Sequence, residues 1–315
     1  MIPLSIPHLG GNELKYVTDC IEAGWVSSAG SYVTQFENKV AEFAGCKYGV
    51  AASSGTSGLH LAMHMLGIEE GDVVIVPNIT FIASANAVAY TNATPVFIDV
   101  DPDTWQMDLD LLEEWLDANN GVHVKAVMPV HVLGNMCDMP RLMDIAVSHG
   151  LHIIEDSTEA LGSYWNGKSA GSYGTMNVFS FNGNKIITTS GGGMLITQNK
   201  QWADKARFYA TQSRENKPYY EHAELGFNYR MSNICAGIGR GQLKVLNDRV
   251  AKKNHINAFY KRELSSIPFA KFVTADAQDK PNYWLSCIIL DSYERKEKVI
   301  AKLEEQNIEV RHLWK

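Results

Sequence analysis

Apolar residues recur along the first half of the chain at two spacings that alternate. Val33, Phe36, Val40 and Phe43 repeat every three or four positions, which is the spacing of one helix face. Beyond them, short runs rich in β-branched residues take turns with further stretches of helical spacing. The predicted strands are residues 48–52, 73–76, 96–100, 124–130 and 152–155, and the predicted helices are residues 56–66, 81–90, 109–116 and 139–146. This alternation is typical of βαβ units and predicts an α/β fold, with a mostly parallel sheet flanked by helices.

The pattern changes after residue 156. The predicted strands are then 178–181 and 193–197, and the predicted helices are about 202–211 and 233–264. Residues 268–281 contain helix and strand breakers, and they precede an apolar strand (283–290), a charged helix (294–306) and an edge strand (308–311). We therefore predict a large ligand-binding domain at residues 1–245, with an N-terminal arm, and a smaller C-terminal αβ domain at residues 246–315.

Composition excludes several kinds of partner. The 315 residues are 45% hydrophobic, which is enough to bury a large core, and a formal net charge of -7 gives no basic surface for nucleic acid. The five cysteines are scattered without a CxxC pair, so neither a disulfide framework nor a metal site is predicted. We find no signal pattern at the start and no apolar run long enough to cross a bilayer. The prediction is a soluble protein of the reducing cytoplasm.

The residues that follow each predicted strand are candidates for chemistry, because ligands bind parallel sheets beyond the carboxyl ends of the strands. Residues 53–58 follow the first strand, and their small side chains let backbone amides converge at the start of the next helix, which suits a phosphate. Residues 77–81 follow the next strand and place Phe81 where a flat heterocycle can stack. Alone, each has an ordinary interpretation: Ser-Gly-Thr runs are usually turns or helix caps, and a phenylalanine is usually part of the core.

Two later strand ends carry ionisable side chains. His131 follows Pro129 and Val130, and it is either a catalyst or a buried hydrogen-bonded residue; the sequence leaves both open. Residues 155–159 read Glu-Asp-Ser-Thr-Glu, and Asp156 alone would fit a helix cap equally well. The chemical interpretation is favoured because all four strand ends lie upstream of one lysine, Lys185.

Lys185 ends the run Ser180-Phe181-Asn182-Gly183-Asn184-Lys185 and precedes three glycines, 191–193. Pyridoxal 5′-phosphate needs an amine for its Schiff base, a carboxylate beside its pyridine nitrogen, and hydroxyl and amide donors for its phosphate. This chain supplies each in order. An exposed lysine in a polar loop is the alternative, but Ser180 and Phe181 continue the apolar residues 177–179, which indicate a buried strand.

A competing motif lies at residues 162–169. Gly-Ser-Tyr-Trp-Asn-Gly-Lys-Ser matches the phosphate-loop pattern GxxxxGK[ST] in full, which would indicate an ATPase. Such a loop leaves a strand directly and opens a helix, whereas residues 170–174 are turn-forming here. Asn166-Gly167 between residues of β type instead predicts a hairpin turn.

Together these motifs resemble the DegT/DnrJ/EryC1/StrS family of sugar-nucleotide aminotransferases, which use pyridoxal phosphate on the type I (aspartate aminotransferase) fold. The resemblance covers nearly the whole chain. The matching segments are 24–27, 36–37, 54–59, 80–81, 129–131, 155–156, 180–181, 185, 191–193 and 226–230.

The resemblance implies roles for individual residues. Lys185 is expected to be the catalytic Schiff-base lysine and Asp156 the partner of the pyridine nitrogen, while Phe81 stacks on the ring. The remaining cofactor-binding residues are expected to be Gly55, Thr56 and Ser180, which hold the phosphate, and Asn228, which reaches a phosphate in the neighbouring subunit of a homodimer with shared sites.

The chain departs from the family at two points. Glu159 stands where many members have Gln beside the phenolic oxygen of the cofactor, and a carboxyl group there either stays protonated or alters the proton balance. Members generally continue beyond the position of Lys315, so the small domain is expected to be incomplete, either because the chain is a fragment or because it lacks a disordered tail.

The implied reaction moves an amino group from L-glutamate to a nucleotide-linked keto-deoxysugar. The expected acceptor is a 4-keto-6-deoxyhexose on a UDP or GDP carrier. Two alternatives of other classes remain: a pyridoxal phosphate-binding regulator without turnover, and the phosphate-loop ATPase. Some relatives that dehydrate sugars have His in place of the lysine, so Lys185 argues against that branch.

Overall fold

A seven-stranded sheet forms the centre of the computed structural model, which describes residues 1–314. The strand order is β1-β9-β8-β5-β4-β2-β3, and β9 alone runs in the opposite direction to the other six strands. The strands are β1 (Tyr48–Ala52), β2 (Val73–Pro77), β3 (Thr94–Ile98), β4 (Val124–Val127), β5 (His152–Asp156), β8 (Met176–Ser180) and β9 (Gly193–Thr197). The prediction of a mostly parallel sheet is confirmed.

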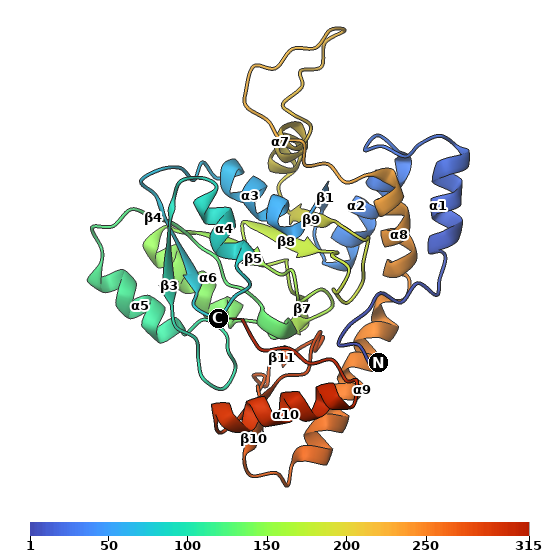
Figure 1. Cartoon of the computed structure of the whole chain (residues 1–315). Helices are drawn as coiled ribbons and strands as arrows, with labels where there is room; N and C mark the ends of the chain where they lie inside the picture. Colours follow the sequence, from blue (N-terminus) through green and yellow to red (C-terminus); the bar gives the residue numbers. More distant parts are fainter. Residues whose placement is uncertain (315) are drawn as a thin grey trace.

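Helices cover both faces of this sheet (Figure 1). Val74 and Val76 of β2 pack with α3, α4 and α7, whereas Ile75 between them packs with α5 and α6 on the other face. Successive side chains of a strand point to opposite faces, so a strand buried on both sides is apolar at every position. The helices of this region are α1 (Glu13–Glu22), α2 (Ser31–Phe43), α3 (Gly55–Met65), α4 (Ala83–Ala89), α5 (Leu109–Ala118), α6 (Met139–His149), α7 (Lys200–Ala210) and α8 (Asn233–Leu243), with a 3-10 turn η1 (Val132–Gly134).

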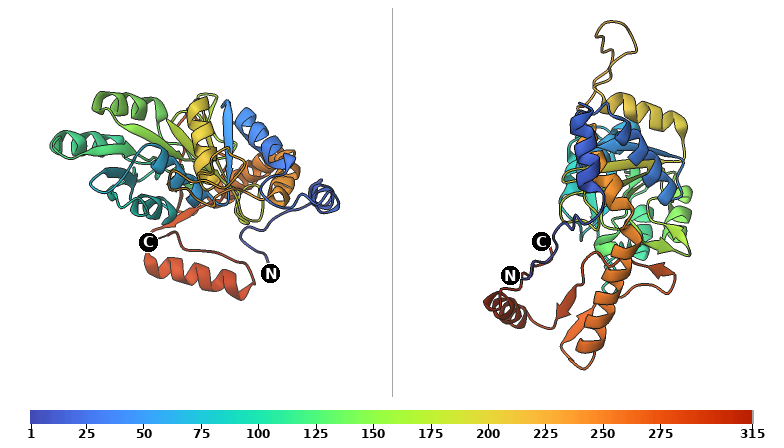
Figure 2. Two further views of the ribbon diagram at one scale, coloured as in Figure 1. Left: turned by 90° about the horizontal axis from the view of Figure 1, so that it is seen from above. Right: turned by 90° about the vertical axis from the view of Figure 1, so that its right-hand side faces the viewer.

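The remaining elements lie below the sheet in Figure 1, at the opposite end from the loop that projects between α7 and α8, and the side view in Figure 2 agrees. They are α9 (Leu246–Leu264), β10 (Ala270–Phe272), β12 (Ile288–Leu290) and α10 (Tyr293–Glu305), and β10 pairs with β12. A short strand from this part, β11 (Asp279–Lys280), pairs with β6 (Tyr164–Trp165) of the large part. The division at residues 245 and 246 stays a prediction, although α9 begins there.

Three predicted elements of the second half are wrong in extent. The helix predicted at 233–264 breaks into α8 and α9, because Val245 takes φ -109° after a glycine-rich run of low helix propensity. The strand predicted at 283–290 is reduced to β12, since Tyr283 has a left-handed φ of +46° that no strand accommodates. The predicted edge strand 308–311 is a single bridge between Ile308 and Ile2, next to which Pro3 has no N–H to continue a ladder.

Smaller differences concern the ends of the chain and of the elements. Helix α1 has no counterpart among the predictions, and β4 ends at Val127, three residues before its predicted end, with only a bridge at Val130. Among residues 1–314, no helix combines the length and the apolar character that a membrane span requires.

Candidate active site

A cavity of about 330 Å³ opens beyond the carboxyl ends of β1, β2, β5 and β8. Its walls come from the start of α3, the segment before α4, the end of β5 and the loop between β8 and β9. Seven of the eight predicted site residues line this one cavity: Gly55, Thr56, Phe81, Asp156, Glu159, Ser180 and Lys185. The fold therefore gathers residues that lie up to 130 positions apart in the sequence.

The start of α3 forms a cradle for an anion. Ser54 caps the helix and exchanges hydrogen bonds with Ser57, whose backbone N–H is thereby satisfied, while Gly55 and Thr56 of the same turn line the cavity. Gly55 has no room for a side chain, because an added Cβ would lie 2.9 Å from Cβ of Ser180. The close approach keeps the Ser180 hydroxyl beside the N–H groups of Gly55 and Thr56, and this donor set suits a phosphate.

Asp156 is the last residue of β5 and is buried. Its Oδ2 accepts a hydrogen bond from Ser84 Oγ at 2.7 Å, and its Oδ1 accepts one from the backbone N–H of Thr158 at 3.2 Å. These two donors fix the carboxyl group at the cavity, where it can pair with a protonated ring nitrogen. Phe81, by contrast, is 52% exposed and presents a free aromatic face to the same cavity.

The side chains of Lys185 and Glu159 are in contact in the wall of the cavity. Lys185 Nζ lies 3.4 Å from Glu159 Oε1, and Glu159 Oε2 accepts the backbone N–H of Leu133 at 2.8 Å. Burial raises the pKa of the Glu159 carboxyl, while Lys185 and the Leu133 N–H oppose that rise. Glu159 is thus a carboxyl group that can hold a proton next to the amine.

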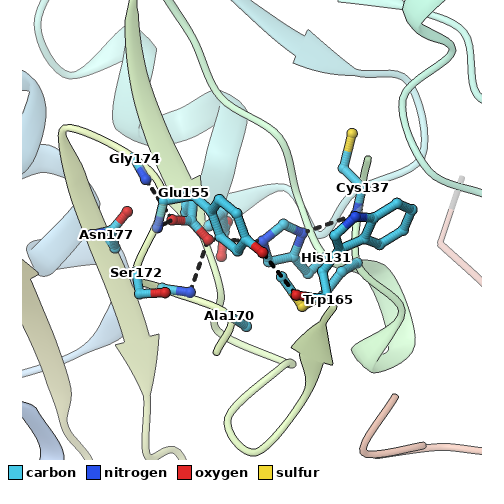
Figure 3. Close-up of polar contacts among 12 residues, drawn as sticks. His131, Cys137, Glu155, Trp165, Ala170, Ser172, Gly174 and Asn177 are labelled. Carbon is cyan, nitrogen blue, oxygen red and sulfur yellow. Dashed lines mark hydrogen bonds and ion pairs between the residues drawn. The ribbon is translucent and has the colours of Figure 1, made fainter. Parts of the chain in front are cut away.

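His131 proves to be a buried, hydrogen-bonded residue outside the cavity. The backbone N–H of Cys137 points at its Nδ1 (3.4 Å), so Nε2 carries the hydrogen and donates to Glu155 at 3.1 Å (Figure 3). The fully buried Glu155 also accepts three backbone N–H groups, those of Gly171, Tyr173 and Gly174. Glu155 therefore anchors the loop after β7 (Lys168–Ser169), and of the two interpretations of His131 the structural one holds.

Asn228 does not line the cavity of its own chain. It lies in a separate crevice of about 440 Å³ that also contains Arg214, Lys217 and Arg230. The apparent phosphate loop at residues 162–169 does not form a nucleotide-binding loop. There β6 and β7 form a hairpin whose turn residues, Asn166 and Gly167, both have positive φ, and the next regular element is a strand instead of a helix. The hairpin prediction is confirmed.

Sequence reasoning missed two tryptophans of the cavity wall, Trp284 and Trp314. Both come from the C-terminal part, in segments without a recognisable motif, and only folding brings them near Lys185. Trp284 falls within the strand predicted at residues 283–290, so the pattern predicts it as part of a strand that does not form there.

The cavity fits pyridoxal phosphate, because the rigid cradle of Gly55 and Ser180 suits the phosphate group, Asp156 suits the ring nitrogen and Lys185 is a shielded amine. This sheet and cavity agree with the type I pyridoxal phosphate fold that the family resemblance implies.

Comparison with known proteins narrows that class. The model of the DegT/DnrJ/EryC1/StrS aminotransferase family matches residues 7–315, and the chain belongs to this family. It is similar to EpsN of Bacillus subtilis (strain 168), named as a pyridoxal phosphate-dependent aminotransferase, with 42% identity over 316 residues, 100% of this chain and 81% of EpsN. It is 41% identical to GDP-perosamine synthase of Escherichia coli O157:H7 over 313 residues, 99% of this chain and 84% of that protein.

A solved structure agrees in fold. DesV of S. venezuelae superposes with a TM-score of 0.88 at 28% identity, covering 95% of this chain and 78% of DesV. The protein is therefore a pyridoxal phosphate-dependent sugar aminotransferase with the type I fold. Neither the regulator without turnover nor the ATPase is supported.

Proposed function

We propose that this enzyme moves an amino group from L-glutamate to the keto carbon of a GDP-linked 4-keto-6-deoxyhexose. The observation that carries the proposal is that Lys185 shares one cavity with two buried carboxyl groups, those of Glu159, 3.4 Å from its Nζ, and of Asp156. The 41% identity to GDP-perosamine synthase supports GDP over UDP as the carrier.

Each residue of the cavity has a definable task in this proposal. When bound, pyridoxal phosphate supplies a carbonyl that takes up the amino group and a ring that withdraws electrons. Lys185 Nζ moves the proton at the reacting carbon, and Glu159, 3.4 Å away, exchanges a proton with that amine. The carboxylate of Asp156 would pair with the protonated ring nitrogen. Gly55, Thr56 and Ser180 would hold the phosphate, and Phe81 would cover one face of the ring.

The enzyme is further proposed to act as a homodimer in which Asn228 serves the neighbouring site. Asn228 lies outside its own cavity and has basic neighbours, as a residue that reaches another subunit's phosphate would. The exposed Tyr220 lines the same crevice, and Trp25 and Leu225 are exposed as well, which supports a second copy as the partner. Five free cysteines support a reducing cytoplasmic location.

A direct test offers the purified enzyme L-glutamate with either a GDP-linked or a UDP-linked 4-keto-6-deoxyhexose. We expect the amino sugar and 2-oxoglutarate to form in equal amounts, with a kcat/KM at least about tenfold higher for the GDP substrate. Equal rates with both carriers would contradict the choice of GDP. Amino transfer from another amino acid but not from L-glutamate would contradict the proposed donor.

A further inference from the structure

Trp284 lies directly over the amine of Lys185. The Nζ atom is 4.2 Å from the centroid of the indole ring, and the indole is only 3% exposed. The Lys185 side chain is itself 13% exposed, so this contact takes place largely out of water. The reaction as described above assigns no task to Trp284.

The indole is held in place at its polar end. Trp284 Nε1 donates a hydrogen bond to the backbone oxygen of Asn184 at 2.7 Å, and Asn184 immediately precedes Lys185. The backbone N–H of Trp284 donates to Oδ1 of Asn282 at 2.8 Å. Position and tilt of the ring are thus fixed relative to the lysine.

Asn282 connects this short segment, residues 282–284, to the turn that carries Glu159. It is fully buried, and its Nδ2 donates to the backbone oxygens of Glu159 at 2.8 Å and Leu161 at 3.0 Å. Its own N–H donates to Ser163 Oγ at 2.9 Å. Every hydrogen-bonding atom of the Asn282 side chain therefore has a partner, and one residue sets both Trp284 and the backbone of Glu159.

The backbone conformation at this segment indicates that it is imposed by these contacts. Tyr283 has φ +46°, a region that residues with a Cβ avoid unless their surroundings demand it. Gly134 makes room for the amide, because a Cβ there would lie 2.0 Å from Oδ1 of Asn282. The segment keeps this conformation because the Asn282 side chain bonds both to Trp284, after Tyr283, and to the backbone of Glu159 and Leu161.

An aromatic face attracts a cation, and the attraction grows when both groups are desolvated. The other ionisable groups near Lys185 are Glu159 and Asp156 in the same cavity, with His8, Arg249 and Lys253 in the adjoining crevice. We propose that Trp284 is a positioning residue that holds the ammonium form of free Lys185 between the indole and Glu159, and that Asn282 sets this arrangement. The arrangement itself is inferred from the geometry, and only the use of the ammonium proton in catalysis rests on the proposed function.

The test measures how fast Lys185 is acylated. Protein loaded with pyridoxamine 5′-phosphate leaves the lysine amine free, and acetic anhydride at trace amounts labels the unprotonated amine, quantified by peptide mass spectrometry against the exposed Lys39. We expect Trp284→Leu to raise labelling of Lys185 at pH 8 about tenfold, whereas Trp284→Phe, which keeps an aromatic face, stays within about threefold of wild type. The Leu effect should shrink steadily as the pH is raised to 11, because lysine amines lose their protons in this range and less of the ammonium form is left to be held in any variant.

Two results would overturn the inference. Equal increases in the Phe and Leu variants, or an increase that is as large at pH 11 as at pH 8, would mean that Trp284 only shields the lysine. No increase in Trp284→Leu would mean that the indole does not act on the amine at all. The labelling assay does not depend on amino transfer from L-glutamate. A protein that failed to transfer the amino group would therefore contradict the proposed function and leave this inference untouched.

Asn282→Asp tests the second half of the inference. It keeps Oδ1 for the Trp284 N–H and removes both Nδ2 donors, so we expect labelling to rise as in Trp284→Leu. Asn119→Asp is the matched control, because Asn119 Nδ2 donates to the Trp115 backbone oxygen far from the cavity. Labelling at the wild-type rate in Asn282→Asp would remove Asn282 from the arrangement.

Discussion

Asp156 receives hydrogen bonds from a hydroxyl and a backbone N–H, and both donors leave its charge directed into the cavity. A neutral amide in its place can still accept the backbone N–H, and Ser84 Oγ can reverse its role and accept from the amide. The contacts that hold the residue would thus survive while the charge is lost. Replacing the Asp156 carboxylate by an amide can therefore test its charge without breaking the hydrogen bonds that hold the side chain.

Asp156→Asn is expected to bind cofactor and to turn over about ten- to a hundredfold more slowly than wild type. This range corresponds to the loss of one charge-assisted hydrogen bond, worth about 1.5–3 kcal/mol. Cofactor content and kcat of purified variants measure the two effects separately. A kcat near that of wild type would argue against Asp156 as the partner of the ring nitrogen.

At the scale of elements, the strand ends and the helix starts that follow them build the site. β1 leads into α3, and the turn between them depends on the absence of a side chain at Gly55. Sequence reasoning found this arrangement because each strand end carries its chemistry within a few residues of an apolar run. It could not place Trp284 or decide the role of His131, since both depend on contacts across the fold rather than on spacing.

The same contrast explains the errors in secondary structure. The strands of the sheet are buried on both faces and therefore read as continuous apolar runs. The short strand β10 is only partly buried and leaves no pattern in the local sequence. The turn at Tyr283 depends on Asn282, so the apolar run at residues 283–290 predicts a longer strand than β12. Secondary structure was thus predicted correctly where burial on both faces requires a continuous run of apolar residues.

Gly55→Ala tests the cradle at the start of α3. The new Cβ would press on Ser180 and Thr158, displacing the Ser180 hydroxyl, so we expect cofactor affinity to fall at least about tenfold. Gly121→Ala is the control, because a Cβ there meets nothing within 4 Å. Titration of the cofactor-free proteins with pyridoxal phosphate gives both affinities. Unchanged affinity in Gly55→Ala would place the phosphate elsewhere.

At the scale of the whole molecule, the C-terminal part is joined to the large part by β11, which pairs with β6, and by the buried Asp279 of that strand. Asp279 Oδ2 accepts the backbone N–H of Met136 at 2.9 Å, while Oδ1 has no partner among residues 1–314. Burial raises the pKa of Asp279 to about 8. The folded protein therefore keeps a proton that the unfolded chain releases near pH 4.

Stability should consequently fall as pH rises through this window, because the unfolded state binds fewer protons than the folded state. The contribution of Asp279 is fully present below about pH 4 and is lost by about pH 8, with a slope of about 1.4 kcal/mol per pH unit. Asp279→Asn should remove that slope from the free energy of unfolding, measured with urea between pH 5 and pH 8. The same slope in both proteins would show that Asp279 does not titrate in this window.

The proposed dimer makes a prediction about mixtures. A Lys185→Ala chain and an Asn228→Asp chain are each expected to be inactive, the second because its carboxylate would repel the phosphate in the neighbouring site. After subunit exchange, one of the two sites in each mixed dimer pairs an intact Lys185 with an intact Asn228, and half of the activity should return. Proven exchange without recovered activity would mean that each site is built within one chain.

Amino transfer through Lys185 is the central claim, and the release of 2-oxoglutarate in a single turnover with L-glutamate tests it most directly. Lys168→Ala provides the matched control, because that lysine lies in the β6–β7 hairpin. We predict that the wild type and Lys168→Ala react at similar rates, and that Lys185→Ala is slower by at least about 10². Release by Lys185→Ala within about tenfold of the wild-type rate would contradict the claim.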